Sequence, residues 1–250
     1  MQLTRQAKIS YFKPAWADEF PLWAGFSTRN GGVSRPPFNS LNLGLHTDDA
    51  AYNVEGNRST LCRAFDIAPQ NLLTVHQVHG SDILDSDAII TNQPRAMLGI
   101  LVADCYPVLF WHPHAAVIAA AHVGWRGAAG GIIGKTLQAL AELFGAAAEK
   151  LYCAVGPGIS AAHYEVDRTV KDAFAQSGCR WEEIAREKTF GRWRLDLRHC
   201  CRLQLERAGV PANRISGCDE YCTYANRELF FSYRRDNGQT GRQMGFIMIK

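Results

Sequence analysis

The feature that most constrains the fold of this chain is a pair of apolar runs that follow each other closely in the sequence. They read LVADCYPVLFW and AAVIAAAHVGWRG, within the segment from Leu101 to Gly127. Both are rich in Val, Ile, Leu, Ala and aromatic residues, and a His-Pro-His segment separates them. Runs over 99–111 and 115–123 with this composition predict a β-hairpin or two adjacent buried strands. Polar residues inside such strands therefore need an explanation.

Four polar residues interrupt these runs. Cys105 and His122 can each bind a metal or take part in nucleophilic chemistry, and Asp104 and Arg126 lie beside them in the sequence. One interpretation is a core hairpin with incidental polar residues, because buried Cys is common in protein cores. The other is an active site supported by rigid strands. The two runs alone do not decide between them.

The remaining elements indicate the fold class. Apolar residues at helical spacing predict helices at 53–65, 130–144, 167–176 and 196–208. Short β-branched and aromatic runs predict strands at 72–78, 152–155, 229–233 and 245–249. Helices and strands interleave without strict alternation, which favours a layered α/β or α+β fold with a mixed sheet flanked by helices. Without linkers or repeats, residues 1–250 are expected to form a single domain.

Composition and charge argue against several classes of protein. The formal net charge of +3 is too small to indicate binding to nucleic acid or to a membrane surface. The first residues contain no apolar core of a signal peptide, and Asp104 and Pro107 break the longest apolar run, which argues against a membrane span. We therefore expect a cytoplasmic protein. Its oligomeric state is left open.

The cysteines are expected to be reduced. A chain with eight cysteines and no export signal is more consistent with free thiols than with a disulfide framework. A structural zinc site near the C-terminus is an alternative, disfavoured because no C-x-x-C spacing occurs and the adjacent pair points to different helix faces. Its four residues would be Cys200, Cys201, Cys218 and Cys222.

A different constellation suits an open catalytic metal site. His79 follows a predicted strand, Cys105 lies within one, and His122 ends another. Three ligands from separate strand ends are typical of catalytic zinc, and one thiolate with two imidazoles suits zinc or copper better than magnesium. Residue types alone still favour ordinary buried side chains over a metal site. His76 is a further candidate, as an acid/base group or as a hydrogen-bond partner of a ligand.

Arginines near glycines supply candidate anion sites. HVGWRGAAGG predicts a strand-to-helix junction, where backbone N–H groups and Arg126 would bind phosphate; close helix–strand packing explains the glycines equally well. Arg29 in STRNGG is a second candidate phosphate ligand. Arg234, Arg235 and Arg242 are surface charges when taken singly, and become informative if they converge.

Several motifs together resemble one known family. In order they are STRNGGVS, FNSLNLG, QVHG, VADCYPV, AAAHVGWRG, VGPGIS with YEV, and FFSYRRDNGQTGRQMGFI. They are similar to the multicopper polyphenol oxidase family, also described as laccase-domain or YfiH-type. The resemblance extends from about Phe26 to Ile249 and is far more specific than any single motif.

This resemblance implies a compact α/β domain distantly similar to a toxin fold with a Cys–His hydrolase site. It implies that His79, Cys105 and His122 are zinc ligands. It also implies phosphorolysis of adenosine, inosine and S-methyl-5′-thioadenosine, and deamination of adenosine. Polyphenol oxidation and editing of a peptidoglycan precursor are further activities described for members of the family.

The residues favour the nucleoside reactions. A multicopper oxidase needs several H-x-H pairs on all-β domains, whereas this chain has eight histidines and one such pair. Copper at the zinc position is still compatible with some oxidation. Phosphorolysis requires basic residues that bind phosphate, for which Arg126 and Arg29 are the candidates. Deamination requires a proton shuttle, for which Asp104, Glu165 and His76 are candidates by residue type. A hydrolase with Cys105 as nucleophile and His122 as base, and a non-catalytic binding module, are the alternatives.

Overall fold

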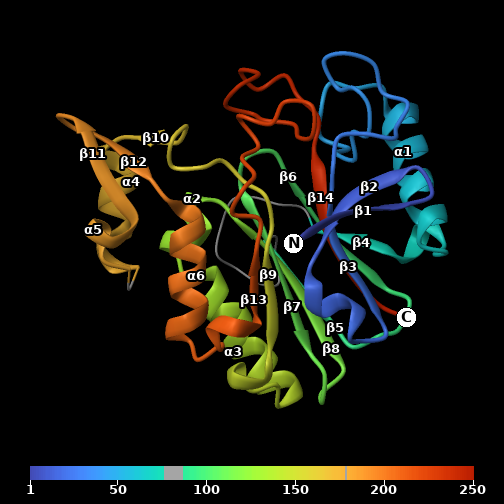
Figure 1. The fold of residues 1–250 in the computed structure, drawn as a ribbon, viewed down its shortest axis with the longest axis horizontal. Coiled ribbons are helices and arrows are strands. Elements are labelled where there is room, and N and C mark those ends of the chain that lie inside the picture. Colours follow the sequence, from blue (N-terminus) through green and yellow to red (C-terminus); the bar gives the residue numbers. More distant parts are fainter. Residues whose placement is uncertain (76–86, 178) are drawn as a thin grey trace.

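Two large mixed sheets form the centre of the computed structural model, which describes residues 1–75, 87–177 and 179–250 (Figure 1). The first sheet consists, in spatial order, of β1 (Gln2–Gln6), β2 (Ile9–Lys13), β3 (Leu22–Ser27), β14 (Gln243–Ile249), β6 (Met97–Val102) and β4 (Leu72–Thr74). The second consists of β13 (Ile215–Gly217), β9 (Tyr152–Val155), β7 (Tyr106–His112), β8 (Val117–Val123) and β5 (Ala88–Thr91). Neighbouring strands are antiparallel except for the parallel pairs β4–β6 and β13–β9.

Helices cover the outer faces of both sheets (Figure 1). Helix α1 (Ala51–Ala64) packs on the first sheet, and α3 (Ile132–Phe144) and α6 (Leu197–Arg207) pack on the second. A small third sheet consists, in spatial order, of β10 (Glu165–Val166), β12 (Arg192–Leu195) and β11 (Ala185–Thr189). The short helices α4 (Arg168–Ala173) and α5 (Trp181–Ile184) belong to the same part of the chain. None of the helices in the described ranges is long and apolar enough to cross a membrane.

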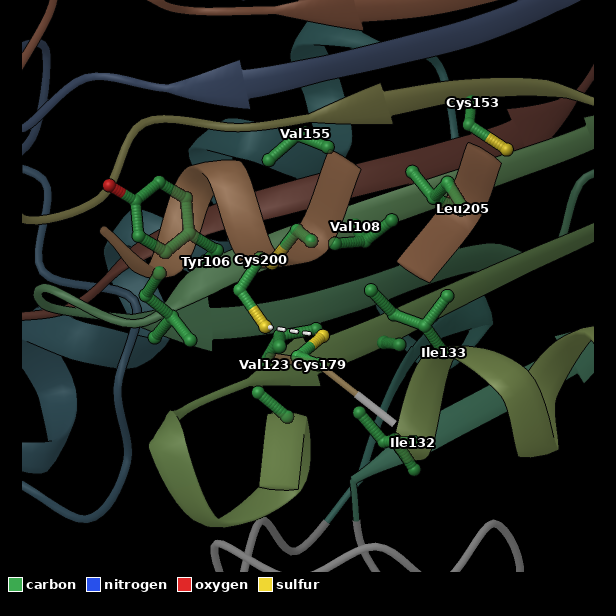
Figure 2. Close-up of a cluster of buried hydrophobic side chains, with 14 of the residues drawn as sticks. Tyr106, Val108, Val123, Ile132, Ile133, Cys153, Val155, Cys179, Cys200 and Leu205 are labelled. Carbon is green, nitrogen blue, oxygen red and sulfur yellow. Dashed lines mark hydrogen bonds between the residues drawn. The ribbon is translucent and has the colours of Figure 1, made fainter. Parts of the chain in front are cut away.

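Strand alternation explains how the layers hold together. Leu109 and Trp111 of β7 point into the apolar layer between the two sheets, whereas Val108 and Phe110 point toward the helices. Figure 2 shows the helix side of this core, with labelled side chains that include Val108, Val123, Ile132, Ile133 and Leu205. Because both faces of β7 and β8 are buried, these strands are almost entirely apolar, as the two runs in the sequence predict; the exceptions are His112 and His122.

The expected fold class is confirmed, and so are the four predicted helices, with ends shifted by a few residues. The prediction of one strand over 99–111 was wrong. The chain turns at Asp104, which has a φ of 94°, so β6 joins the first sheet and β7 joins the second.

The predicted strand at 229–233 was also wrong. The backbone N–H of Phe231 donates to Oε1 of Gln243 at 2.9 Å, and Gln243 Nε2 donates to the Phe231 carbonyl at 3.2 Å. A side-chain amide therefore satisfies backbone groups that a neighbouring strand would otherwise bind.

His112 at the end of β7 should make stability sensitive to acid. It is 3% exposed, its Nδ1 accepts a hydrogen bond from Ala115, and Nε2 has no hydrogen-bond partner among the described residues. Burial, followed by the nearby His114 and Lys150, lowers the pKa of His112. The unfolded chain therefore binds the proton more readily, so the free energy of unfolding should fall as pH drops below about 6.5.

Urea titrations between about pH 7.5 and 5 test this expectation. In the His112→Gln variant, the free energy of unfolding should fall less with decreasing pH than it does in wild type. In the His114→Gln variant, it should fall more than in His112→Gln. An identical pH dependence in wild type and His112→Gln would show that this imidazole does not contribute.

Candidate active site

A cavity of about 640 Å³ opens where the β6–β7 connection crosses between the sheets and β8 ends. Asp104, Cys105, His122 and Arg126 all line it, so the structure brings together four of the residues singled out in the sequence. Its volume is in the range of sites for small organic ligands. The active-site interpretation of the two apolar runs therefore has a physical basis.

The strands place a thiol beside an imidazole. Cys105 immediately precedes β7, and His122 lies on β8 opposite Pro107. His122 Nδ1 lies 2.7 Å from Oδ1 of Asp87, and the His122 backbone N–H donates to the Asp87 carbonyl, also at 2.7 Å. Two contacts from one fully buried residue thus fix the orientation of the ring.

The pKa of His122 reflects this environment. Burial acts to lower it, but the charge of Cys105 and the hydrogen bonds to Asp87 and Cys105 outweigh burial and raise the pKa to about 9. The thiol–imidazole contact is therefore electrostatically strong. Such a pair can hold a metal or form a nucleophile–base dyad.

The thiol of Cys105 and the imidazole of His122 are two of the three protein ligands expected for zinc. Both are typical zinc donors, and a carboxylate bonded to the second ring nitrogen, as Asp87 is here, commonly orients a ligating His. His79 and His76 lie outside the described residues. Within the described ranges no group of three or more His, Cys, Asp or Glu could hold a metal. The three-ligand set therefore remains a prediction.

Asp104 links two distant loops. Its Oδ1 accepts a hydrogen bond from the Thr223 hydroxyl at 2.6 Å, and its Oδ2 accepts one from the backbone N–H of Arg234 at 2.7 Å. Asp104 is 8% exposed. This geometry supports a positioning role rather than the proton-shuttle role expected from residue type.

Substituting Thr223→Val tests this link, because valine keeps the shape of threonine and removes the hydroxyl. One buried carboxylate oxygen loses its partner, so we expect a loss of about 1–3 kcal/mol in the free energy of unfolding. Urea denaturation measures the difference. Thr60→Val on the partly buried surface of α1, where the hydroxyl donates to the carbonyl of Gly56 and accepts from the exposed Arg63 guanidinium, is the control and should change stability less. Equal losses in the two variants would argue against a special role for the Asp104 bond.

Three arginines converge on the cavity: Arg126, Arg234 and Arg242. Arg126 comes from α2 (Trp125–Ala129), directly after β8, as the sequence predicts. The other two come from the C-terminal loop before β14, where the sequence marks them only as basic residues. Three guanidinium groups around one cavity favour an anionic ligand.

Aromatic rings line the same cavity. The Arg234 guanidinium lies 5.4 Å from the ring centre of Tyr164, and that of Arg242 lies 5.7 Å from the ring centre of Tyr233. Within the described part of the chain, Nη1 of Arg234 donates a hydrogen bond to the Glu165 carbonyl at 3.0 Å. The other N–H groups of this guanidinium can donate to a ligand.

The Tyr164 hydroxyl stays protonated at neutral pH. Burial is the largest cause that raises its pKa, Cys105 and Asp104 add to the shift, and Arg234 and Arg126 oppose it. The phenol is therefore a neutral hydrogen-bond donor in the cavity that these four groups also line. Sequence reasoning did not single out Tyr164 or Tyr233 as site residues: both fall within the motifs that resemble the family, but an isolated Tyr resembles a core residue.

Two other candidates lie elsewhere. The structure does not bring Arg29 to this cavity. Its Nε and Nη1 donate to the carbonyls of Asn39 and Arg227, and it borders a separate depression. Glu165 lies on β10 and pairs with Lys188 at 2.6 Å. Arg29 is therefore a loop-stabilising residue in this geometry.

The family is established by comparison with known proteins. The family model described as "Multi-copper polyphenol oxidoreductase laccase" matches residues 23–250, so this chain belongs to that family, as its motifs predict. Over 246 residues it is 36% identical to Purine nucleoside phosphorylase YfiH of Escherichia coli (strain K12), covering 94% of this chain and 97% of that one. It is 40% identical over 230 residues to Purine nucleoside phosphorylase of Deinococcus radiodurans, covering 89% and 87%.

Solved structures agree with the fold. YlmD from Geobacillus stearothermophilus superposes with a TM-score of 0.92 at 33% identity, covering 99% of this chain and 98% of that one. The Bacillus licheniformis hypothetical protein YfiH gives a TM-score of 0.91 at 31% identity, covering 97% of each chain. The fold is therefore shared with these two solved structures.

Proposed function

We propose that this protein is a purine nucleoside phosphorylase that uses the cavity beside Cys105 and His122. The observation that carries the proposal is the convergence of three arginines and two tyrosines on one small-ligand cavity. A phosphate and a purine nucleoside present an anion and a flat ring, which match these two kinds of side chain. Relatives named purine nucleoside phosphorylase support the same activity.

The arginines bind and orient the phosphate. Arg126 and Arg234 both act electrostatically on Tyr164, so the two cations lie around one phenol that can donate a further hydrogen bond. Holding phosphate here places an oxygen for attack on the ribose C1′ as the bond to the purine breaks. Fixed positive charges also stabilise the phosphate oxygens during the transfer.

The tyrosine rings are suited to bind the purine base of a nucleoside. Tyr233 is 56% exposed at the cavity, and the nearby Arg242 keeps its guanidinium beside the ring. A purine can stack on such a ring. We propose inosine, adenosine and S-methyl-5′-thioadenosine as substrates, and adenosine deamination as a second reaction at the same site.

Zinc is the proposed cofactor, held by Cys105 and His122, with His79 as the ligand implied by the family resemblance. When bound, it would supply a Lewis acid that polarises an oxygen or lowers the pKa of a water molecule. Asp87 would keep the His122 ring oriented for this role. Copper in the same place is the proposed origin of any oxidase activity.

A phosphate-dependence assay tests the proposal. Purified protein supplied with zinc should release hypoxanthine from inosine at a rate that rises and saturates with phosphate. Equal release without phosphate would indicate hydrolysis instead. No release from inosine, adenosine or S-methyl-5′-thioadenosine would refute the proposal.

A further inference from the structure

A second thiol–imidazole cluster lies outside the Cys105 site. It consists of Ser160, His163 and Cys222, on the loop after β9 and in the C-terminal segment. Ser160 Oγ lies 3.2 Å from Cys222 Sγ and 3.3 Å from His163 Nδ1, and the sulfur lies 3.7 Å from that nitrogen. The His163 ring stacks on Tyr224 with ring centres 4.6 Å apart, which fixes its orientation.

The sulfur of Cys222 accepts hydrogen bonds. Both the backbone N–H of Ser160, at 3.3 Å, and the Ser160 hydroxyl donate to it. Two donors therefore point at the sulfur, and His163 Nδ1 lies 3.7 Å from it, within reach of the thiol proton. Cys218, four residues earlier, has the opposite environment: its thiol donates to Met1 Sδ, and burial raises its pKa to about 12.

We propose that Cys222 is a modification site, a thiol that hydrogen peroxide and other small peroxides oxidise to a sulfenic acid. A small oxidant suits its limited access, since Cys222 is 8% exposed and Cys218 is 3% exposed. The reaction proposed at the Cys105 site does not use this cluster. Its arrangement of two donors and one base around a sulfur points to reactivity instead.

The reaction balances with the peroxide as the only co-reactant. The thiol proton moves to His163 Nδ1, and the sulfur electron pair attacks one peroxide oxygen. The O–O bond breaks as the S–O bond forms, so the sulfur is oxidised and the peroxide is reduced. The departing hydroxide takes the proton from His163 and leaves as water.

Oxidation of Cys222 would affect the cavity through the next residue, Thr223. The Gly158–Cys222 β-bridge and the bond from the Thr223 N–H to the Gly158 carbonyl hold two loops together. The Thr223 side chain donates to Asp104 at the cavity wall. An added oxygen on the packed sulfur should therefore disturb the Thr223–Asp104 bond and lower the rate of the proposed reaction.

Peptide-level labelling tests the proposal. Trypsin releases residues 215–227, ISGCDEYCTYANR, which contain both Cys218 and Cys222. After treatment with hydrogen peroxide and dimedone, fragmentation should locate the label at Cys222 and not at Cys218. His163→Phe keeps a ring for stacking and removes the nitrogen, and should slow labelling on the order of tenfold. Equal labelling of both cysteines, or an unchanged rate in His163→Phe, would overturn the proposal.

An activity readout tests the link to the cavity and rests on the proposed function, whereas the labelling does not. In wild type, phosphate-dependent base release should fall in step with the label at Cys222. Cys222→Ala should lose its starting rate more slowly than wild type under the same treatment, because only oxidation at other thiols such as Cys105 remains. Equal losses in both proteins would place the damage elsewhere and overturn the link.

Discussion

Replacing Cys105 with serine should lower kcat/KM for inosine phosphorolysis by about 100-fold or more, while the chain stays folded. The oxygen of serine is a poorer zinc donor and a weaker partner for His122 than a thiolate. Loss of a group that acts directly in catalysis commonly costs a factor of about 10² to 10⁴. Initial rates at saturating phosphate, together with zinc content by mass spectrometry, measure the effect.

A second cysteine gives the matched control. Cys62 is 1% exposed in the apolar cluster under α1, away from the cavity, so Cys62→Ala should reduce stability and leave kcat/KM nearly unchanged. A Cys105→Ser protein that retains both wild-type turnover and zinc would mean that the thiol is dispensable. Wild-type turnover without zinc would instead separate catalysis from the metal.

Replacing Arg234 with methionine should raise the KM for phosphate by about 10- to 100-fold and change the KM for inosine far less. A charge-assisted hydrogen bond contributes about 1.5–3 kcal/mol, which corresponds to this range. The Asp104 contact survives the substitution, because it uses the backbone N–H of Arg234. Steady-state kinetics with each substrate varied in turn separate the two constants.

Arg168→Met is the control for lost positive charge. Arg168 lies on α4 with a side chain 84% exposed and a weak pairing to Asp172 at 3.6 Å. Its substitution should leave both KM values unchanged. If Arg234→Met raised the KM for inosine as much as that for phosphate, Arg234 would belong to the nucleoside subsite and the assignment would be wrong.

Local patterns in the sequence predict the layers of this fold well. Strands β7 and β8 are apolar on both faces, and α3 buries Ile132, Ile133 and Leu137 at helical spacing. Such signals lie within a few residues of each other. The break between β6 and β7 at Asp104 has no such local signal. The residues that hydrogen-bond to Asp104, where φ is positive, are Thr223 and Arg234, more than a hundred residues away along the chain.

The site was predictable where its residues lie in strands or next to them. Cys105 directly precedes β7, His122 lies on the paired strand β8 and Arg126 lies on the helix that follows, so one hairpin brings them to the same cavity. Tyr164 and Arg242 reach the cavity only through the tertiary fold, and no spacing rule connects them. Arg29 shows the reverse: its glycine-rich context resembles a phosphate loop, yet backbone carbonyls occupy its guanidinium.

Identification of the sugar product by phosphorus NMR tests the central proposal most directly. With wild-type protein, inosine and inorganic phosphate, a ribose 1-phosphate signal should grow in step with hypoxanthine while the phosphate signal declines. Arg234→Met should slow both changes at low phosphate. Hypoxanthine formed together with free ribose, and no sugar phosphate, would contradict phosphorolysis at this cavity.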